Sequence, residues 1–307
     1  MTKVFIDGSA GTTGLRIVER LSERTDLELL ILPDELRKDT SARADALHSA
    51  DVAFLCLPDD AAKESAALAA GSKVKIIDTS TAHRVDPHWV YGMPELSGQR
   101  QKILESSRIA NPGCHASGFV ALVAPLVQAG LLAKETALSC FSLTGYSGGG
   151  KKMIAEYEDT GRNTLLGAPR QYALTQSHKH LKEMVKLCGL ENAPVFCPIV
   201  ADFYSGMEVT VPVFASQLKG SVEDVKKLYA SYYRQGLIRF TEDTDPDGML
   251  SANALSGRDD MTVTVTGNEE RILLVSRFDN LGKGASGAAI QNMNLLLGLP
   301  ESTGLTV

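Results

Sequence analysis

A glycine-rich segment near the start of the chain constrains its fold more than any other stretch. It lies between an apolar run at residues 4–6 and apolar residues that recur at helical spacing, namely Ile17, Val18 and Leu21. This order predicts a buried strand, a glycine loop and a helix. Glycines at such a point allow a tight turn and a close approach of the backbone to a pyrophosphate, which the helix N-terminus stabilises. We expect the cofactor contacts of this loop at Gly8, Gly11, Thr12, Thr13 and Gly14.

The spacing of these glycines leaves a second interpretation open. They follow the pattern G-x-x-G-x-x-G, whereas dinucleotide-binding loops more often carry G-x-G-x-x-G. A plain tight turn between strand and helix would use the same residue type.

The segments that follow predict an α/β fold with a Rossmann-type, doubly wound parallel sheet. Apolar runs at 27–32, 52–57 and 74–78 are strand-like, and an alanine-rich helix is expected over 60–70. Ligands bind at the carboxyl edge of such sheets, so Ser80 and Arg84, after the fourth strand, are candidate contacts. Ser80 is assigned to the cofactor. Arg84 is assigned to a phosphate or carboxylate of the substrate, with a surface ion pair as its alternative.

The charged residues after the second strand favour two different cofactors. Asp34 or Glu35 would accept a hydrogen bond from a ribose 2′-hydroxyl, which favours NAD. Arg37 and Lys38 would pair with a 2′-phosphate, which favours NADP. A third interpretation is that these residues form a solvated loop that does not contact the cofactor.

Cys114 is the candidate nucleophile. Pro112 and Gly113 end a strand-like segment, and an apolar helical pattern begins after Cys114, which places the thiol at a helix N-terminus. The positive end of a helix stabilises a thiolate, the reactive form of cysteine. Cys56, Cys140, Cys188 and Cys197 have apolar neighbours, whereas Cys114 has polar ones. The alternative for any free cysteine is a small buried apolar side chain.

Composition excludes several classes of protein. The chain has 307 residues, of which 44% are hydrophobic and 22% charged, so it is long enough for about two globular domains. A net charge of −6 without a basic run indicates no nucleic-acid or membrane partner. Five cysteines without close pairs predict neither a disulfide framework nor a zinc site, and we expect no metal. No apolar run of transmembrane length or cleavable signal is found, so we expect a cytoplasmic protein.

A second, α+β domain with a mainly antiparallel sheet is expected after Cys114. Alternating runs at 207–211, 261–265 and 272–275 predict antiparallel strands with one wet face. A glycine-rich turn at 282–284 precedes a helix over 287–297, which we expect to pack on the first domain. The predicted boundaries are 1–113 with 284–307 for the dinucleotide-binding domain and 114–283 for the catalytic and oligomerisation domain.

Two further segments carry candidate site residues. Residues 145–151 match the G-x-x-x-x-G-K part of a phosphate loop, but Lys152 stands where a magnesium-binding Ser or Thr is required. The segment would instead bind an anionic substrate through Ser147, Gly148 and Lys151, or be a flexible surface loop. His178 and His180, two residues apart near a helix start, are expected to point in different directions. One of them could be the acid–base partner of a cysteine, and a simply exposed histidine is the alternative.

Over nearly its whole length the chain resembles the short form of the N-acetyl-γ-glutamyl-phosphate reductases, a family of the semialdehyde dehydrogenase superfamily that acts in arginine biosynthesis. The resemblance rests on five marks: Asn111-Pro112-Gly113-Cys114, residues 91–96 (YGMPEL), the 146–150 loop, His178-x-His180-x-x-Glu183, and residues 280–285 (NLGKGA) with Gln291-Asn292.

The resemblance implies a mechanism and several residue roles. Cys114 would be the acyl-accepting nucleophile, His180 the acid–base residue and Tyr172 a further catalytic residue. Asn280 would contact the cofactor, which would be NADP(H), and that choice favours Arg37 and Lys38 as ligands of a 2′-phosphate. The partner would be a small-molecule acyl phosphate, and the protein a homo-oligomer, either a dimer or a tetramer. His115 departs from the family, which is expected to have an aromatic residue such as Tyr at this position.

Two other functions stay open on the sequence. An aspartate-semialdehyde dehydrogenase-like reductase would share the two-domain plan and the cysteine chemistry with this chain, as more distantly would a glyceraldehyde-phosphate dehydrogenase. Asn-Pro-Gly-Cys and His-x-His-x-x-Glu argue against both. A non-catalytic NADP-binding sensor would keep the glycine loop without needing a reactive thiol.

Overall fold

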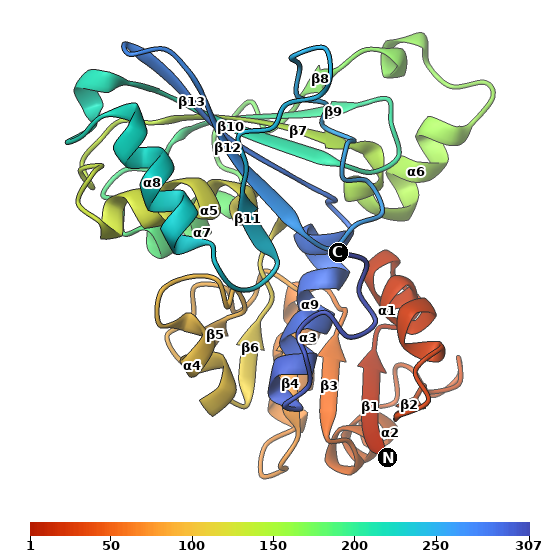
Figure 1. The fold of residues 1–307 in the computed structure, drawn as a ribbon. Helices are drawn as coiled ribbons and strands as arrows, with labels where there is room; N and C mark the ends of the chain where they lie inside the picture. The colour runs from red at the N-terminus through yellow and green to blue at the C-terminus, as the bar shows by residue number, and fades with distance from the viewer. The chain divides into compact units, whose positions relative to one another are not determined.

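The computed structural model describes residues 1–307, which form two compact units (Figure 1). Unit 1 consists of Met1–Pro94, Gly98–Pro112 and Ala285–Leu305. Unit 2 consists of Glu95–Ser97, Gly113–Gly284 and Thr306–Val307. Neither unit has a helix that is long and apolar enough to cross a membrane.

A six-stranded parallel sheet forms the centre of unit 1. Its strands are β1 (Thr2–Asp7), β2 (Leu27–Leu30), β3 (Val52–Leu55), β4 (Lys75–Asp78), β5 (Val90–Tyr91) and β6 (Arg108–Ala110). They lie in the order β2-β1-β3-β4-β6-β5, and every neighbouring pair is parallel. All four residues of β3 are buried, as expected for a strand that is covered on both faces.

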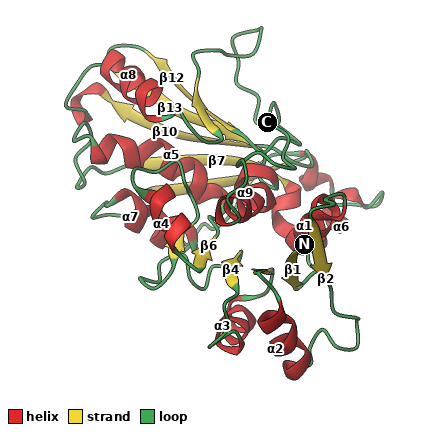
Figure 2. Cartoon of the chain, turned by 60° about the horizontal axis from the view of Figure 1, so that its bottom comes forward, coloured by secondary structure: helices red, strands yellow, loops and turns green.

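Helices cover both faces of this sheet. They are α1 (Thr12–Ser22), α2 (Thr40–Ser49), α3 (Asp59–Leu68), α4 (Gln99–Glu105) and α9 (Gly287–Leu296). Ile17 of α1 and Ile290 of α9 share a core with Val4, whereas Leu47 of α2 lies in a second core with Phe5. Successive residues of β1 therefore point to opposite layers, and Figure 2 shows α2 and α3 together on one side of the sheet. The predicted doubly wound sheet and the predicted packing of the last helix are confirmed.

Unit 2 is built on a seven-stranded mixed sheet. Its strands are β7 (Ser139–Gly145), β8 (Arg170–Gln171), β9 (Val195–Ala201), β10 (Met207–Phe214), β11 (Ile238–Phe240), β12 (Met261–Gly267) and β13 (Arg271–Phe278). They lie in the order β11-β12-β13-β10-β7-β9-β8. The β7–β9 and β11–β12 pairs are parallel and the other four are antiparallel, so the predicted, mainly antiparallel sheet is confirmed.

The expectation of one wet face is wrong for β12. Thr262 and Thr264 should face water by alternation, but they are only 5% and 1% exposed. The neighbouring Arg277 of β13 pairs with Thr262 in register and donates to Asp245 at 2.7 Å. The segment that carries Asp245 therefore covers this face of the sheet. The alternating pattern of β12 cannot predict this covering segment, because it comes from another part of the chain.

The helices of unit 2 include one that is almost fully buried. They are α5 (Cys114–Gln128), α6 (Gly150–Glu158), α7 (His180–Cys188) and α8 (Val222–Tyr232), with 3₁₀ helices at Tyr146–Gly149, Thr164–Gly167 and Ala215–Gln217. In α5 every residue from His115 to Leu126 is buried. A Cβ at Gly118 would lie 2.5 Å from Cγ2 of Val209, so this glycine allows α5 to lie directly on β10. Tyr229 of α8 donates to the carbonyl oxygen of Leu122 on the same helix.

Residues 282–284 do not form the predicted glycine-rich turn. Gly282–Ser286 is a π-helix, in which the Gly284 N–H donates to the carbonyl oxygen of Asp279, five residues earlier, at 2.9 Å. The Asp279 carboxylate accepts from the N–H groups of Leu281 and Gly282 and fixes the start of the segment. Lys283, on this π-helix, is 3% exposed and donates to the buried carboxylate of Glu95 at 2.7 Å.

We expect Lys283→Met to lower the free energy of unfolding by about 3–5 kcal/mol, because it removes the ammonium group from beside a buried carboxylate. Urea unfolding followed by far-ultraviolet circular dichroism measures this cost. The double variant Glu95→Gln, Lys283→Met is the control, since a neutral amide oxygen can still accept the hydrogen bond that the Leu237 N–H donates to Glu95. Equal stability of Lys283→Met and the unsubstituted chain would contradict this account.

Candidate active site

In unit 1 the glycine loop connects β1 to α1. Gly8 has a φ of +86°, and a Cβ there would lie 2.3 Å from the carbonyl oxygen of Cys56. A Cβ at Gly14 would lie 2.4 Å from the carbonyl oxygen of Gly8. Both positions therefore require glycine for backbone conformation or packing.

The start of α1 offers backbone donors. Gly11 is its N-cap residue, and no side chain accepts a hydrogen bond there. Thr12 and Thr13 are the first two helical residues, so their N–H groups have no partner within the helix. These donors and the positive end of the helix fit an anion such as a pyrophosphate. The structure thus shows the tight turn at Gly8 and Gly14, and it leaves the helix start at Gly11, Thr12 and Thr13 as a candidate anion site.

The opposing charges after β2 interact with each other. Arg37 Nη2 lies 3.0 Å from Asp34 Oδ1, with Asp34 exposed and Arg37 half-buried. Glu35 and Lys38 are both exposed. Asp34, which would favour NAD, therefore forms an ion pair with Arg37, which would favour NADP. This ion pair orients the Arg37 guanidinium group.

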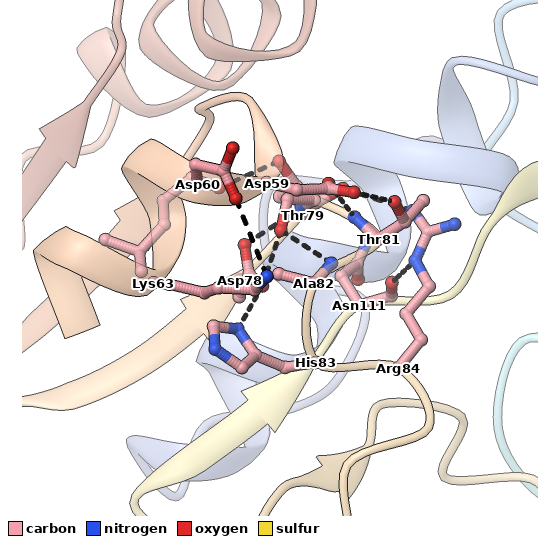
Figure 3. A network of polar contacts seen from close by, with 12 residues as sticks. Asp59, Asp60, Lys63, Asp78, Thr79, Thr81, Ala82, His83, Arg84 and Asn111 are labelled. Carbon is pink, nitrogen blue, oxygen red and sulfur yellow. Dashed lines mark hydrogen bonds and ion pairs between the residues drawn. The ribbon is translucent and has the colours of Figure 1, made fainter. Parts of the chain in front are cut away.

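A polar network follows β4 at the edge of the unit 1 sheet (Figure 3). The buried Asp78 carboxylate accepts from the N–H and the hydroxyl of Ser80 at 2.9 and 2.8 Å. His83 Nδ1 lies 2.6 Å from Asp78 Oδ2, and the His83 ring stacks on Trp89 with centroids 4.0 Å apart. The Ser80 hydroxyl therefore serves the turn itself, and Ser80 is 8% exposed.

Arg84 forms hydrogen bonds to backbone carbonyls, as Figure 3 shows for its contact with Asn111. Its Nε donates to the Asn111 oxygen at 2.9 Å and its Nη2 donates to the Thr79 oxygen at 3.1 Å. The Asn111 side chain in turn donates to the carbonyl oxygen of Ala285 at 3.0 Å. Arg84 thus connects the turn after β4 to the Asn-Pro-Gly-Cys segment.

In unit 2, Cys114 is the first residue of α5, as predicted. Gly113 is the N-cap residue, and its N–H donates to Oε1 of the buried Glu183 at 2.8 Å. The Cys114 residue is half-buried, and its sulfur lies at the positive end of a 15-residue helix. The N-terminus of a helix is a favourable environment for a negative charge, and the Glu183 carboxylate already lies at this end of α5.

The surroundings of other cysteines disfavour a thiolate. Burial raises the pKa values of the Cys140 and Cys188 thiols well above the usual range. Burial also raises the pKa of the Cys56 thiol to about 12. None of these three cysteines begins a helix.

A glycine makes room for the Cys114 side chain. A Cβ at Gly284, within the π-helix, would lie 3.0 Å from Cβ of Cys114 and 3.1 Å from the carbonyl oxygen of Asp279. Any side chain at this position would therefore press on Cys114. The glycine at 284 belongs to a motif that the sequence singled out, but its packing role is visible only in the structure.

Three histidines and a tyrosine form one cluster in unit 2. The ring centroids of His178 and His180 are 4.7 Å apart, and those of His115 and His180 are 5.5 Å apart. Tyr172 lies 6.1 Å from His115, centroid to centroid. The prediction that His178 and His180 point in different directions is wrong, because His178 precedes α7 and the His180 N–H donates to its Nδ1 at 3.2 Å. His180 is 6% exposed, which also rules out a simply exposed ring.

His115 and Ser142 are the members of this site that the sequence did not identify. His115 Nδ1 lies 2.6 Å from the Ser142 hydroxyl, and its Nε2 lies 2.7 Å from the Tyr172 hydroxyl. Burial, with a smaller contribution from His178, lowers the pKa of His115 to about 3, so its ring is neutral near pH 7. The alternation of buried residues in β7 could have predicted that Ser142 is buried, but it could not have predicted that Ser142 contacts His115.

The residues around 147 are regular structure rather than a flexible surface loop. The 3₁₀ helix that contains Ser147 and Gly148 leads into α6, where Lys151 is exposed in the first turn. Asn280 lies in unit 2, where its Nδ2 donates to the Ser147 hydroxyl at 3.0 Å and its Oδ1 accepts from the Gly206 N–H at 2.9 Å. A hydrogen bond thus connects Ser147, a predicted substrate contact, to Asn280, a predicted cofactor contact.

Comparison with known proteins identifies the family. Residues 114–280 match the family model for the semialdehyde dehydrogenase dimerisation domain, and residues 33–105 match its NAD-binding domain. The second match supports a nicotinamide dinucleotide as the cofactor class of this chain. Among solved structures, aspartate semialdehyde dehydrogenase II from Vibrio cholerae has the same fold, with a TM-score of 0.73 at 19% identity over 97% of this chain and 98% of that one.

Curated relatives narrow the assignment. An N-acetyl-γ-glutamyl-phosphate reductase from Nostoc sp. is 45% identical over 99% of both chains. One from Brucella ovis is 46% identical over 96% of this chain and 99% of the relative. Such identity over the whole length exceeds what a shared fold alone would explain. The chain therefore belongs to the semialdehyde dehydrogenase family and, within it, to the N-acetyl-γ-glutamyl-phosphate reductases, which are oxidoreductases.

Proposed function

We propose that this chain reduces N-acetyl-γ-glutamyl phosphate to N-acetylglutamate 5-semialdehyde with release of phosphate, a step of arginine biosynthesis, using NADPH and a thioester on Cys114. The observation that carries the proposal is a half-buried cysteine at the start of α5, in a chain that is 45% identical to such a reductase over 99% of its length. In this proposal unit 1 binds the cofactor and unit 2 holds the acyl group.

The first step is acyl capture. The Cys114 thiolate attacks the acyl carbon, the C–S bond forms, and the bond from that carbon to the phosphate oxygen breaks. Phosphate leaves with its electron pair, and a thioester remains. The Gly113 N–H already donates to the Glu183 carboxylate. In this proposal the N–H groups that follow it in the first turn of α5 donate to the acyl oxygen, which becomes negative during the attack.

The second step returns the thiolate. When bound, NADPH supplies the hydride that reduces the acyl carbon. His180 can give a proton to the oxygen of the tetrahedral carbon and takes the same proton back as the C=O bond re-forms, while the C–S bond breaks and Cys114 leaves as the thiolate. The aldehyde is the product, and the cysteine is ready for another acyl group.

Substrate contacts come from the remaining candidates. Ser147 accepts a hydrogen bond from Asn280, so its own hydroxyl hydrogen is oriented for another acceptor. Gly148 and Lys151 add a backbone N–H and an ammonium group near the start of α6. These groups suit the phosphate and carboxylate of the substrate.

We expect Cys114→Ser to lose at least about 10³-fold in kcat, because the hydroxyl is a far weaker nucleophile than a thiolate. His180→Asn should lose about 10²-fold, as expected for a general acid–base residue. The assay follows NADPH oxidation with N-acetyl-γ-glutamyl phosphate, and cofactor binding, measured by fluorescence, should persist in both variants.

The control for this assay is aspartyl phosphate, the acyl phosphate of the alternative reductase. Preference for aspartyl phosphate would overturn the substrate assignment without affecting the cysteine chemistry. Retained turnover of Cys114→Ser, or failure of iodoacetamide to label Cys114 at neutral pH, would contradict the nucleophile and favour a non-catalytic NADP-binding protein.

The choice of NADP over NAD rests on Arg37, with Lys38 beside it. We expect Arg37→Ala to raise the KM for NADPH about 10- to 100-fold, because it removes charge-assisted hydrogen bonds to the 2′-phosphate. The KM for NADH should change little. Glu35→Gln is the matched control, since it alters an exposed charge in the same segment. Equal effects of Arg37→Ala on both cofactors would contradict this role.

The unit 2 sheet carries an apolar face that suits a homo-oligomer, either a dimer or a tetramer. Phe141, Val195, Phe214 and Leu273 are 47%, 56%, 60% and 41% exposed. Their registers place them on one face, opposite the face of β10 that lies against α5. Exposed apolar side chains that cluster in this way are typical of protein interfaces.

We expect Phe141→Asp to shift the sedimentation coefficient toward that of the monomer, because a buried carboxylate at an interface has no partner there. Analytical ultracentrifugation measures the shift. Leu165→Asp is the control, because Leu165 is 66% exposed on a 3₁₀ helix outside the sheet. An unchanged association state in Phe141→Asp would place the interface elsewhere.

A further inference from the structure

Ser142, His115 and Tyr172 form a chain of hydrogen bonds inside unit 2. The Ser142 hydroxyl lies 2.6 Å from His115 Nδ1, and the Tyr172 hydroxyl lies 2.7 Å from His115 Nε2. Each of the two imidazole nitrogens therefore has one hydroxyl partner. A neutral imidazole carries one hydrogen, so only one of these nitrogens donates.

The burial of Ser142 decides which nitrogen carries the hydrogen. Ser142 is 0% exposed, and its hydroxyl has one hydrogen bond, to His115 Nδ1. A buried hydroxyl hydrogen without an acceptor costs about 1–3 kcal/mol. Ser142 therefore donates to Nδ1, and His115 carries its hydrogen on Nε2.

This tautomer sets the direction of the Tyr172 hydroxyl. His115 Nε2–H donates to the Tyr172 oxygen, so the tyrosine hydrogen is directed at a different acceptor. Burial raises the pKa of Tyr172 above its usual value, and a smaller contribution comes from the negative charge of the nearby Cys114 thiolate. Tyr172 is thus protonated near pH 7, and its hydrogen-bond partner His115 directly follows Cys114 on α5.

The backbone after Tyr172 is strained and fixed. Ala173 and Gln176 have φ values of +52° and +56°, which side chains rarely adopt. The Gln176 amide accepts from the N–H of Phe196 at 2.8 Å and donates to its carbonyl oxygen at 2.7 Å. Phe196 also packs edge-on against His115, with ring centroids 5.4 Å apart. Strain of this kind persists only where the surrounding structure imposes it.

We propose that Ser142 and His115 are positioning residues that direct the hydroxyl of Tyr172, as a hydrogen-bond donor, at the acyl oxygen formed on Cys114. This inference rests on the proposed function for the identity of that acyl group. It gives a purpose to His115, a buried residue that the proposed reaction does not otherwise use.

Nitrogen-15 spectra of the full chain with labelled histidine test the tautomer at pH 7. The His115 signals are assigned by their loss in His115→Gln. We expect a neutral ring with the hydrogen on Nε2, and a mixture of tautomers in Ser142→Ala. Ser276→Ala is the matched control, because Ser276 is a buried serine opposite the same residue of β10, Val209. A ring with the hydrogen on Nδ1 would overturn the proposal.

A double-mutant cycle tests the effect on the reaction. Tyr172→Phe should lose about 10²-fold in kcat, and His115→Phe about 10-fold or more. If His115 acts through Tyr172, His115→Phe should cost little further in the Tyr172→Phe background. His115→Gln, whose amide can still donate to Tyr172, should recover much of the loss. Additive losses would show a merely structural role for His115 and overturn the proposal.

The two experiments separate this inference from the proposed function. A chain that does not reduce N-acetyl-γ-glutamyl phosphate contradicts the proposed function. The tautomer of His115 and its response to Ser142→Ala are measured without any substrate, and their outcome decides for or against the Ser142–His115–Tyr172 arrangement in either case.

Discussion

The structure depends most on how the first turn of α5 is stabilised. The Gly113 N–H is satisfied by the carboxylate of Glu183, which lies on α7, and not by a side chain of its own turn. A negative charge at this end of a helix interacts favourably with the macrodipole. It also connects two segments that both contribute to the candidate site, because His180 is the first residue of the helix that carries Glu183. One hydrogen bond therefore connects the start of the helix that carries Cys114 to the helix that carries His180.

Glycines determine how closely the backbone approaches this turn. Gly118 lets α5 rest on β10, with no space for a Cβ beside Val209. Gly284 gives the same clearance on the side of Cys114, where the π-helix passes the thiol. Since α5 is buried from His115 to Leu126, it has no freedom to shift and relieve a larger side chain at either point. Packing thus fixes α5 against β10, and Gly284 leaves room for the half-buried Cys114 side chain.

Several buried polar groups in both units form hydrogen bonds that orient candidate site residues. In unit 1, Asp78 binds Ser80 and His83, and Arg84 donates to the carbonyl oxygens of Thr79 in the turn and of Asn111 after β6. In unit 2, the hydrogen bond with the Ser142 hydroxyl orients the His115 ring in the same way. A buried hydrogen-bond donor without an acceptor is costly, so such networks have one preferred arrangement. This is why a serine remote from the thiol can control the direction of a tyrosine hydroxyl.

The four strands β1 to β4, the doubly wound class of their sheet and the helix start at Cys114 were determined by the sequence alone, because each follows from residues close together in the chain. Hydrophobic periodicity marks a strand or helix, and proline with glycine marks its end. Contacts between distant segments carry no such signal. The pairing of His115 with Ser142 and Tyr172, the convergence of His178 and His180, and the burial of Thr262 and Thr264 were decided only by the tertiary structure. For His115 and for the two threonines the deciding partner comes from another element, whereas His178 and His180 converge because His178 precedes α7 and accepts from the His180 N–H.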